Sequence, residues 1–290
     1  MTTVHLIDGT YELFRHHFGA PPRQTADGWE IGAVHGLVAS TISLLAEDGV
    51  THVGVAFDSV IESFRNDMFD GYKTGEGTPP ELYAQFPVAE RAMEALGVVV
   101  WSMIEQEADD GLAAAATKYA PDVDRVVILS PDKDMSQLYG DPKIVGYDRR
   151  KAAFIDTEGV WEKFGVAPES IPDYLALVGD TADGIPGLPG WGAKSTGTVL
   201  AEYTHLDEIP ESEDDWAVKV RSAPKLAATL RDNMADALLY RDLATLRTDA
   251  EIPQTLDELE WKGVHKDEFI ALCDELDFGG IRNRPKLWQG

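Results

Sequence analysis

Residues 125–134, RVVILSPDKD, join a short apolar segment to an acidic one. The first five of them have the length and the β-branched composition of a strand, which Ser130-Pro131-Asp132 ends. Asp132 and Asp134 therefore follow directly after the predicted strand. In an open parallel sheet, ligands bind outside the carboxyl ends of the strands, so this segment predicts acidic side chains at a ligand-binding edge.

The same order, an apolar segment and then an acid, occurs at two earlier places in the chain. VHLI at residues 4–7 is a predicted strand that ends at Asp8, and the predicted strand over residues 51–57 ends at Asp58. Segments with helical spacing separate these strands. The alternation predicts an α/β fold in which helices flank a mostly parallel central sheet on both faces. We also expect a strand over residues 97–101, helices over residues 31–46, 79–96 and 107–119, and an edge hairpin of residues 144–147 and 153–155.

Beyond residue 157 the pattern changes to helices alone. GIPGLPGWG at residues 184–192 has too many glycines and prolines for a helix or a strand. It is predicted to be a turn between helices near residues 168–178 and 193–203. We therefore expect two domains, an α/β core over residues 1–178 and a helical region over residues 179–290.

Nine carboxylates from five segments are expected to gather around one edge of the sheet. Each has a structural alternative, because a single Asp after a strand is often a turn former and acids at a helix start complement the helix dipole. Like charges a few Å apart raise one another's pKa unless a cation is bound. Oxygen ligands without nearby cysteine or histidine favour Mg²⁺ or Mn²⁺, and two such ions can activate a water for phosphodiester hydrolysis. The nine are Asp8, Asp58, Glu107, Asp109, Asp110, Asp132, Asp134, Asp180 and Asp183.

The charge of the chain conflicts with a nucleic-acid partner. There are 51 Asp and Glu residues against 25 Lys and Arg, a formal net charge of −26, whereas DNA-binding proteins usually present a basic face. Lysines and arginines would therefore have to gather locally on any DNA-binding surface.

Cysteine content and hydropathy bear on the compartment. The single cysteine, Cys273, excludes an internal disulfide and is typical of a reducing environment. No apolar run approaches the ~18 residues of a membrane span, and the N-terminus lacks the pattern of a secretion signal. We expect a cytoplasmic, monomeric protein that does not enter a membrane.

With these residues in place, the sequence resembles the 5′ nuclease family, which includes flap endonucleases, phage 5′ exonucleases and the N-terminal domain of bacterial DNA polymerase I. ELDFGGI at residues 275–281 is similar to the end of that domain, and the chain stops nine residues later, so we expect a stand-alone bacterial member without a polymerase. The resemblance spans nearly the whole chain. It rests on LIDG at 6–9, FDS at 57–59, SFR at 63–65, GYK at 71–73, EADD at 107–110, SPDKD at 130–134 and GDTADGIPGLPGWGAKS at 179–195.

The resemblance implies a PIN-like core and assigns roles to the acids. Arg65 and Lys73 resemble the basic pair that meets the scissile phosphate, on a segment of about residues 62–85 that arches over the site. Glu76 stands where polymerase-type members carry a further basic residue, which weakens this basic gateway. One metal cluster would comprise Asp8, Asp58, Glu107 and Asp109 with Asp110 beside it, and a second would comprise Asp132, Asp134, Asp180 and Asp183.

Residues 184–203 resemble a helix–hairpin–helix (H3TH), which in the family grips the backbone of duplex DNA and holds a potassium ion. Glycines permit close backbone approach there, and the start of the following helix offers amide donors to phosphate. Phe14 occupies a position that is often tyrosine in the family, and its ring is expected to stack on a base, with Arg15 beside it. The implied DNA contacts are therefore Phe14, Arg15, Gly190, Gly192, Lys194 and Ser195.

The resulting prediction is a structure-specific 5′ nuclease that uses a divalent-metal-activated water. Its substrates would be 5′ flaps, nicked DNA and 5′-ended duplexes, in replication or repair. Two alternatives remain open at this point: a DNA-junction binder without catalytic activity, and a ribonuclease of the PIN class. A phosphatase with an aspartate nucleophile is disfavoured, because its DxD motif should follow the first strand and Asp8 is followed by Gly9-Thr10.

Overall fold

The computed structural model describes residues 2–289, which form two compact units. None of the helices in that range combines the length and the hydropathy that a membrane crossing requires. Unit 1 comprises Met1–Ile61, Gly75–Ser130 and Arg247–Gly290, and unit 2 comprises Glu62–Thr74 and Pro131–Leu246.

Unit 1 contains the predicted parallel sheet. Its strands are β1 (Thr3–Asp8), β2 (His52–Asp58), β3 (Val99–Met103) and β4 (Arg125–Leu129), in the order β3-β2-β1-β4. All three pairings are parallel, which confirms the prediction. The third strand begins two residues later than expected, because Gly97 adopts φ 75° in the turn that follows the preceding helix.

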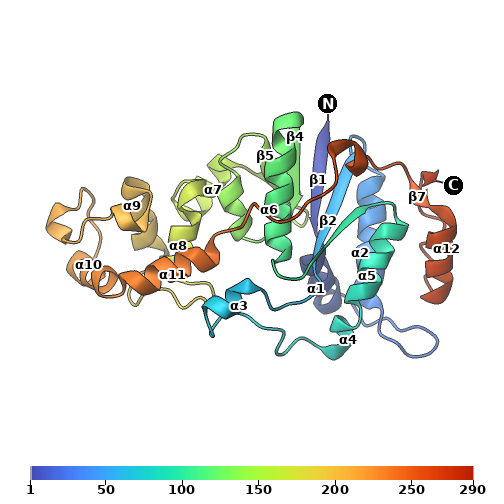
Figure 1. The fold of residues 1–290 in the computed structure, drawn as a ribbon, viewed down its shortest axis with the longest axis horizontal. Coiled ribbons are helices and arrows are strands. Elements are labelled where there is room, and N and C mark those ends of the chain that lie inside the picture. The colour runs from blue at the N-terminus through green and yellow to red at the C-terminus, as the bar shows by residue number, and fades with distance from the viewer. Residues whose placement is uncertain (1, 290) are drawn as a thin grey trace. The chain divides into compact units, whose positions relative to one another are not determined.

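Helices cover both faces of this sheet, as the alternating pattern predicted. In Figure 1, α6 (Ala108–Tyr119) lies on one side of β1 and β2, and α2 (Gly32–Leu45) and α5 (Phe86–Ala95) lie on the other. The side chains of β1, β2 and β4 that face these helices are fully buried, so the core of the unit lies in the sheet itself. The remaining elements of unit 1 are α1 (Gly9–Gly19), α4 (Pro80–Tyr83), α12 (Lys266–Glu275) and the short parallel pair β7 (Val264–His265) and β8 (Trp288–Gln289).

The single helix expected over residues 79–96 was wrong in detail, because the structure divides it into α4 and α5. Pro87 stands in the first turn of α5, where a proline is tolerated because the amides of that turn lack helical partners. Helix α1 was not predicted from the sequence. It begins directly after β1, where the carboxylate of Asp8 accepts a hydrogen bond from the amide of Tyr11 at 2.8 Å.

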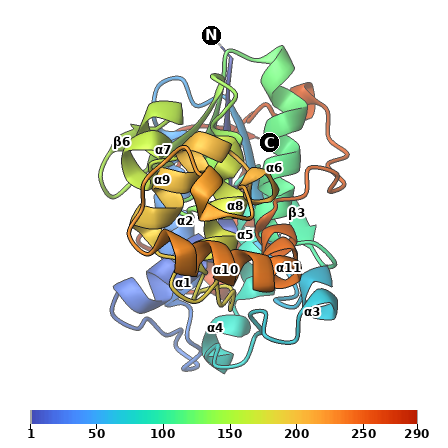
Figure 2. The ribbon, with the colours of Figure 1, turned by 90° about the vertical axis from the view of Figure 1, so that its left-hand side faces the viewer.

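Unit 2 contains the predicted hairpin, and the chain after the hairpin is helical. Strands β5 (Ile144–Asp148) and β6 (Ala153–Ile155) pair in antiparallel register, which confirms the hairpin. Helix α8 (Ile171–Val178) packs against α9 (Ala193–Tyr203) and α11 (Met234–Ala244), and Figure 2 shows these helices with α10. The remaining helices of the unit are α3 (Phe64–Met68), α7 (Thr157–Phe164) and α10 (Ala223–Asp232).

The glycine-rich segment between α8 and α9 is a compact turn. Asp180 and Ile185 exchange two backbone hydrogen bonds of 2.8 Å, and no helix or longer strand forms within residues 180–192. Gly187 adopts φ 70°, and a Cβ there would lie 2.5 Å from the amide nitrogen of Gly179. Only glycine fits this close backbone approach, which agrees with the prediction of a turn.

A buried carboxylate ties three parts of unit 2 together. Asp173, in the first turn of α8, accepts hydrogen bonds from the amide of Leu206 at 3.1 Å and from Nδ1 of His205 at 2.9 Å. Arg241 of α11 lies 3.4 Å from the same carboxylate and also pairs with Asp207. The hydrogen bond with Asp173 raises the pKa of His205 above its ordinary value of 6.5.

This contact predicts a pH-dependent stability. Because the folded-state pKa of His205 is raised, its contribution is complete below about pH 6.5 and is lost as the pH rises through the higher folded value. At about pH 5.5 the wild type should therefore unfold at a higher midpoint concentration of urea than His205→Gln does. The difference between the two midpoints should become smaller by about pH 9. A difference in urea midpoint that stays the same between these pH values would contradict a stabilising role for protonated His205. His265→Gln, which removes an exposed histidine near Glu268, is the matched control.

Candidate metal and DNA site

The first predicted metal cluster lies at the carboxyl ends of β1 and β2 in unit 1. Asp8 ends β1, and its carboxylate is held on both sides: Oδ1 accepts from the amide of Tyr11, and Oδ2 accepts from Oγ of Ser130 at 2.8 Å. Asp58 ends β2 and accepts a hydrogen bond from the amide of Ala108 at 2.7 Å. That contact brings the end of β2 to the start of α6, where Glu107 precedes the helix and is buried.

Asp109 and Asp110 share the first turn of α6 but have different environments. Asp109 is half-buried, whereas Asp110 is fully buried. One oxygen of Asp110 accepts from the amide of Glu107 at 3.0 Å, and the other accepts from the amide of Arg247 at 2.8 Å. Because both oxygens already accept backbone amides, Asp110 fixes the position of Glu107 in this structure. That Asp110 binds a metal itself stays a prediction.

Ser130 was not singled out by sequence reasoning, although it begins the SPDKD motif. Its hydroxyl is buried and donates to Asp8, so it orients that carboxylate. Residues that orient metal ligands typically contribute 10–100-fold to metal affinity. Ser130→Ala should therefore weaken Mn²⁺ binding by about 10-fold or more in titration calorimetry. The control is Ser136→Ala, which changes a buried serine two residues after Asp134. An equal loss of Mn²⁺ affinity in both variants would argue against a specific role for Ser130.

The second cluster, in unit 2, is tighter. Asp134, Asp180 and Asp183 are all buried, and within residues 2–289 they form the only such group whose ligand atoms lie within 4.8 Å of one another. Asp134 begins the short 3₁₀ helix η2 (Asp134–Leu138), and its amide donates to Oδ1 of Asp132 at 2.9 Å. Asp180 and Asp183 are brought there by the backbone bridge of the glycine-rich turn.

The acids of this cluster are difficult to ionise together. Burial raises the pKa of Asp134 well above its ordinary value, and the charges of Asp132, Asp183 and Asp180 raise it further. Burial also raises the pKa of Asp183, although the nearby Lys73 opposes the shift. Repulsion of this kind is relieved when a cation is bound.

Two lysines lie against the cluster. Lys73 Nζ is 2.9 Å from Asp183 Oδ1, and Lys133 forms an ion pair with Asp180. Burial alone would lower the pKa of Lys133, but the hydrogen bond and the charge of Asp180 raise it overall. Lys133 lies inside the SPDKD motif, yet its pairing with a residue 47 positions later gave no local signal.

The donor set fits a hard divalent cation. All the ligand atoms are carboxylate oxygens, which suit Mg²⁺ or Mn²⁺ better than zinc. Oδ1 of Asp134 is buried and has no hydrogen-bond partner, and native proteins rarely leave such an atom unsatisfied. The two lysines pair with Asp183 and Asp180, so the cluster offers the unpartnered oxygen of Asp134 to a further cation.

The structure places the two predicted phosphate-binding cations very differently. The amide of Lys73 donates to the carbonyl of Asp183 at 3.0 Å, so backbone and side chain both hold Lys73 at the second cluster. Arg65 is only 2% exposed, and its guanidinium donates to the carbonyls of Leu243 at 2.8 Å and Thr245 at 3.0 Å. The role of Arg65 at the phosphate stays a prediction, because here its charged group binds the end of α11.

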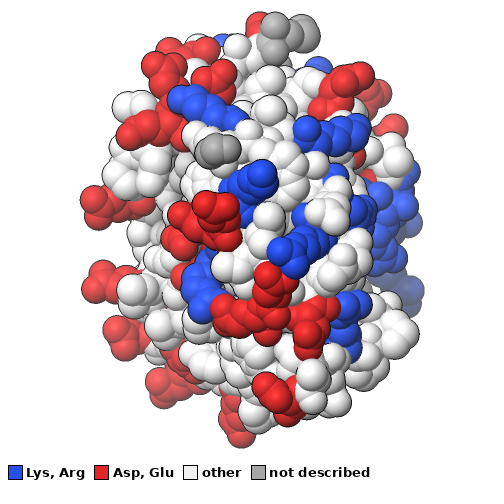
Figure 3. Space-filling view, turned by 90° about the vertical axis from the view of Figure 1, so that its right-hand side faces the viewer, with Lys and Arg blue, Asp and Glu red and all other residues white. Residues whose placement is uncertain are grey.

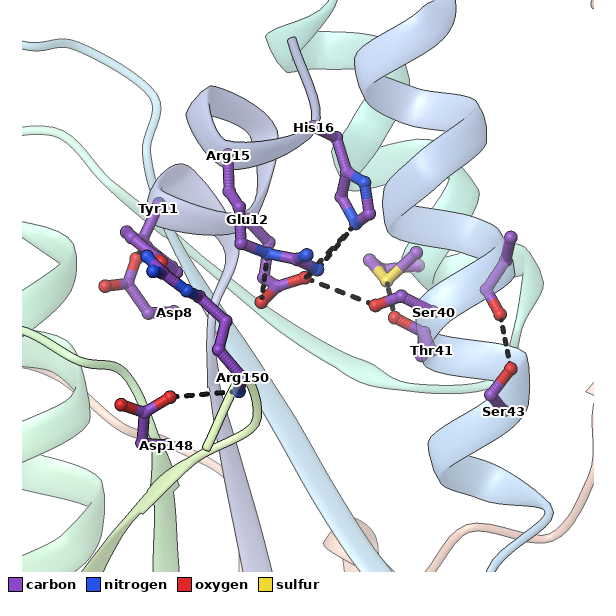
Figure 4. A network of polar contacts seen from close by, with 12 residues as sticks. Asp8, Tyr11, Glu12, Arg15, His16, Ser40, Thr41, Ser43, Asp148 and Arg150 are labelled. Carbon is purple, nitrogen blue, oxygen red and sulfur yellow. Dashed lines mark hydrogen bonds and ion pairs between the residues drawn. The ribbon is translucent and has the colours of Figure 1, made fainter. Parts of the chain in front are cut away.

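The two DNA contacts predicted on α1 lie in unit 1. Phe14 is half-buried and its ring lies 6.2 Å from that of Phe86. Arg15 makes a two-point contact with Glu12, at 2.5 Å and 3.2 Å, and Glu12 also accepts from the hydroxyl of Ser40. Figure 4 shows this network around the buried Glu12, which sequence reasoning did not identify. Arg15 therefore has a neutralising partner within its own helix.

The predicted helix–hairpin–helix presents an open backbone at the start of α9. Gly190 adopts φ 90°, and Gly192, which is exposed, precedes the helix. The hydroxyl of Ser195 accepts from the amide of Gly192 at 3.2 Å and donates to its carbonyl at 3.0 Å, so it fixes the helix start. Lys194 is exposed. Trp191 was missed: it is buried and donates to the carbonyl of Leu226 at 3.2 Å, which anchors α10 to this turn.

The sequence is similar to part of two bacterial DNA polymerases. DNA polymerase I of Bacillus subtilis is 33% identical over 283 residues, which are 96% of this chain and 32% of the polymerase. DNA polymerase I of Mycobacterium tuberculosis is 34% identical over 288 residues, which are 97% of this chain and 31% of that protein. The chain therefore spans about a third of the length of these relatives.

Solved structures share the fold. T5 5′-exonuclease with bound divalent metal ions (zinc) matches with a TM-score of 0.67 and 20% identity, over 94% of this chain and 98% of that one. The catalytic core of Rad2 in complex with DNA substrate matches with a TM-score of 0.61 and 13% identity, over 96% of this chain and 88% of that one. At these identities the likeness establishes the fold.

Family models identify the chain more directly. The model described as the N-terminal resolvase-like domain of 5′-3′ exonucleases matches residues 3–165, and the model of their C-terminal SAM fold matches residues 166–267. The two matches follow one another without a gap and cover most of the sequence. The chain therefore belongs to the 5′-3′ exonuclease family.

Proposed function

We propose that this protein is a structure-specific 5′ nuclease that hydrolyses DNA phosphodiesters at 5′ ends and 5′ flaps, in replication or repair. One observation carries the proposal: the three buried carboxylates of Asp134, Asp180 and Asp183 lie within 4.8 Å of one another, with an unpartnered oxygen among them. Such a group requires a cation, and the family to which the chain belongs consists of 5′-3′ exonucleases.

The cation we propose is Mg²⁺ or Mn²⁺, with at least one ion at each acidic cluster. A divalent ion of this kind supplies an activated water and neutralises the negative charge of the phosphodiester. In the first cluster, Ser130 and Asp110 fix Asp8 and Glu107, so these carboxylates need little reorganisation when they bind a ligand. The proposed ligands are Asp8, Asp58, Glu107 and Asp109 in unit 1, and Asp132, Asp134, Asp180 and Asp183 in unit 2.

Lys73 is proposed to contact the scissile phosphate. In this structure its ammonium group compensates Asp183 at 2.9 Å. With a divalent ion bound beside Asp183, the ammonium group of Lys73 would be free to contact a phosphate oxygen and would stabilise the charge that develops there. Arg65 is proposed to assist after release from its carbonyl partners, which hold it in the interior of unit 2 here.

DNA binding is proposed at the start of α9. The exposed first turn of α9, which follows Gly192, and the exposed ammonium group of Lys194 would provide donors for phosphate oxygens. Gly190 and Ser195, whose hydroxyl accepts from the amide of Gly192, shape the turn that would hold a potassium ion. Phe14 is proposed to stack on a base, with Arg15 beside it. The Rad2 core, which shares the fold, was solved in complex with DNA substrate.

The net charge of −26 does not preclude this partner, because charge is arranged locally. On the face of the molecule shown in Figure 3, Lys and Arg side chains lie among Asp and Glu side chains, so the surface is not uniformly acidic. We further propose that the protein acts as a monomer in the cytoplasm, where its substrate DNA is found.

Cleavage of a 5′-labelled DNA flap tests the proposal. The purified chain should release short labelled products with Mg²⁺ or Mn²⁺, and none with EDTA. A matched flap made of RNA distinguishes a ribonuclease, and a gel-shift assay on the same DNA distinguishes a binder without catalysis. Tight binding without product in either metal, or preferential cleavage of the RNA flap, would overturn the proposal.

A further inference from the structure

Strand β3 forms one edge of the sheet of unit 1, and its outer side has no partner strand. The amide of Ser59 donates to the carbonyl of Met103 at 2.9 Å, so the polar backbone groups of Met103 point toward β2. Because this direction alternates along a strand, the backbone groups of Val100 and Ser102 point away from β2. Among residues 2–289, β2 is the only strand that pairs with β3. An open edge of this kind is a template for a further strand.

The open edge is one wall of a preformed groove with a volume of about 480 Å³. Residues 100–106 form that wall, and Glu251, Pro253 and Gln254 form the other. The second wall is fixed, because Gln254 accepts from the indole of Trp101 at 2.8 Å and from the hydroxyl of Tyr119 at 2.8 Å.

The chemistry of the groove selects its occupant. Glu105 and Glu251 line it, the carboxylate of Glu90 lies 2.8 Å from the hydroxyl of Ser102, and no lysine or arginine is among its described lining residues. Ile104, which is 62% exposed, adds an apolar contact. Acidic walls repel nucleic acid, and they equally repel a second copy of this chain, whose own β3 edge carries the same acids.

We propose that the β3 groove binds an extended, lysine- or arginine-containing segment of a partner protein, which adds a strand to the edge of the sheet. Backbone hydrogen bonds to Val100 and Ser102 would supply the register, and the acidic walls would select basic side chains. None of the residues that line the groove is a proposed metal ligand, so the proposal does not depend on the nuclease activity.

A pair of synthetic peptides tests it on the full chain. The probe is a blocked hexapeptide of alternating lysine and valine, and the comparison is the same peptide with glutamate in place of lysine. Fluorescence anisotropy gives the affinity, and amide chemical shifts give the location. We expect the lysine peptide to bind at least 10-fold more tightly and to shift the amides of Val100 and Ser102 most. A proline at the third position should abolish binding, because it removes a ladder hydrogen bond.

Glu251→Lys should weaken the lysine peptide at least 5-fold, whereas Glu202→Lys, an equal charge change at an exposed residue of α9, should leave the affinity unchanged. Flap cleavage measured on both variants separates this test from the test of the nuclease proposal. Equal binding of the two peptides, no binding of either, or amide shifts away from β3 would overturn the proposal. Self-association of the chain that is lost in Ile104→Lys would also overturn it, because the occupant would then be a second copy.

Discussion

Replacing Asp134 with asparagine is expected to abolish flap cleavage and, at the same time, to stabilise the metal-free protein. The cleavage rate should fall by about 10³-fold or more, because loss of a metal ligand removes several kcal/mol of transition-state stabilisation. The opposite effect on stability follows from burial and like charges, which raise the pKa of Asp134. An amide of the same shape carries no charge and can donate to the neighbouring carboxylates. The melting temperature in EDTA should therefore rise by about 2 °C or more.

Two measurements on the same protein preparation test the predicted loss of cleavage and the predicted gain in stability. Single-turnover cleavage of a labelled flap gives the rate, and thermal melts with EDTA and with Mn²⁺ give the stability. Mn²⁺ should raise the melting temperature of the wild type much more than that of Asp134→Asn. Asp232→Asn, at an exposed position that ends α10, changes the net charge equally and should alter neither quantity. If Asp134→Asn still cleaves the flap, Asp134 is not an essential metal ligand. If the variant melts at a lower temperature than the wild type in EDTA, the charge of Asp134 does not destabilise the metal-free protein.

The fold could be predicted from sequence where the signal is local. Strand β4 was placed at both of its ends because four apolar residues after Arg125 are followed by Ser130, Pro131 and Asp132, and parallel strands are buried on both faces. The hairpin of β5 and β6 and the turn after α8 were likewise marked by nearby residues. The division between α4 and α5 was missed because the helical spacing continues across it, and only Pro87 indicated a new start.

The sequence named the candidate acids but not the different environments that the structure gives them. EADD at residues 107–110 presents three acidic positions that look equivalent in sequence, yet the helix start turns Asp110 inward to accept two backbone amides while Asp109 stays half-exposed. Arg65 and Lys73 form a basic pair in sequence, but a partner for Arg65 lies 178 residues away, at the carbonyl of Leu243. Such contacts depend on tertiary packing, which spacing along the chain does not encode.

The two lysines of the second cluster offset part of the negative charge of its acids. Lys133 and Lys73 each occupy one oxygen of the cluster, at Asp180 and Asp183. Each is a monovalent substitute for part of the charge of a divalent ion, and neither reaches the unpartnered oxygen of Asp134. Metal binding must therefore compete with these ion pairs, and the affinity for the ion reflects the difference between the two arrangements.

This competition predicts opposite effects when Lys73 is replaced by methionine. Without the ammonium group, Asp183 loses its compensating charge, so Mn²⁺ should bind more tightly, by about 3-fold or more, as a close ion pair of this kind is worth about 1 kcal/mol when partly exposed. The single-turnover rate should nevertheless fall by about 10²–10³-fold, because a positioned donor to the scissile phosphate contributes that much. Titration calorimetry and rapid-quench cleavage at saturating Mn²⁺ measure the two effects separately.

Tighter Mn²⁺ binding together with a slower cleavage rate would show that Lys73 has two roles. It would be a counter-ion to Asp183 in the absence of metal and a ligand of the phosphate during the reaction. Tighter binding with an unchanged rate would leave only the first role, and a slower rate with weaker binding would mean that Lys73 merely shapes the cluster. Lys219→Met removes an exposed lysine of unit 2 and should affect neither binding nor rate at saturating substrate. The discrimination is possible because Lys73 lies 2.9 Å from Asp183 in this structure, and the proposed role at the phosphate requires that contact to break.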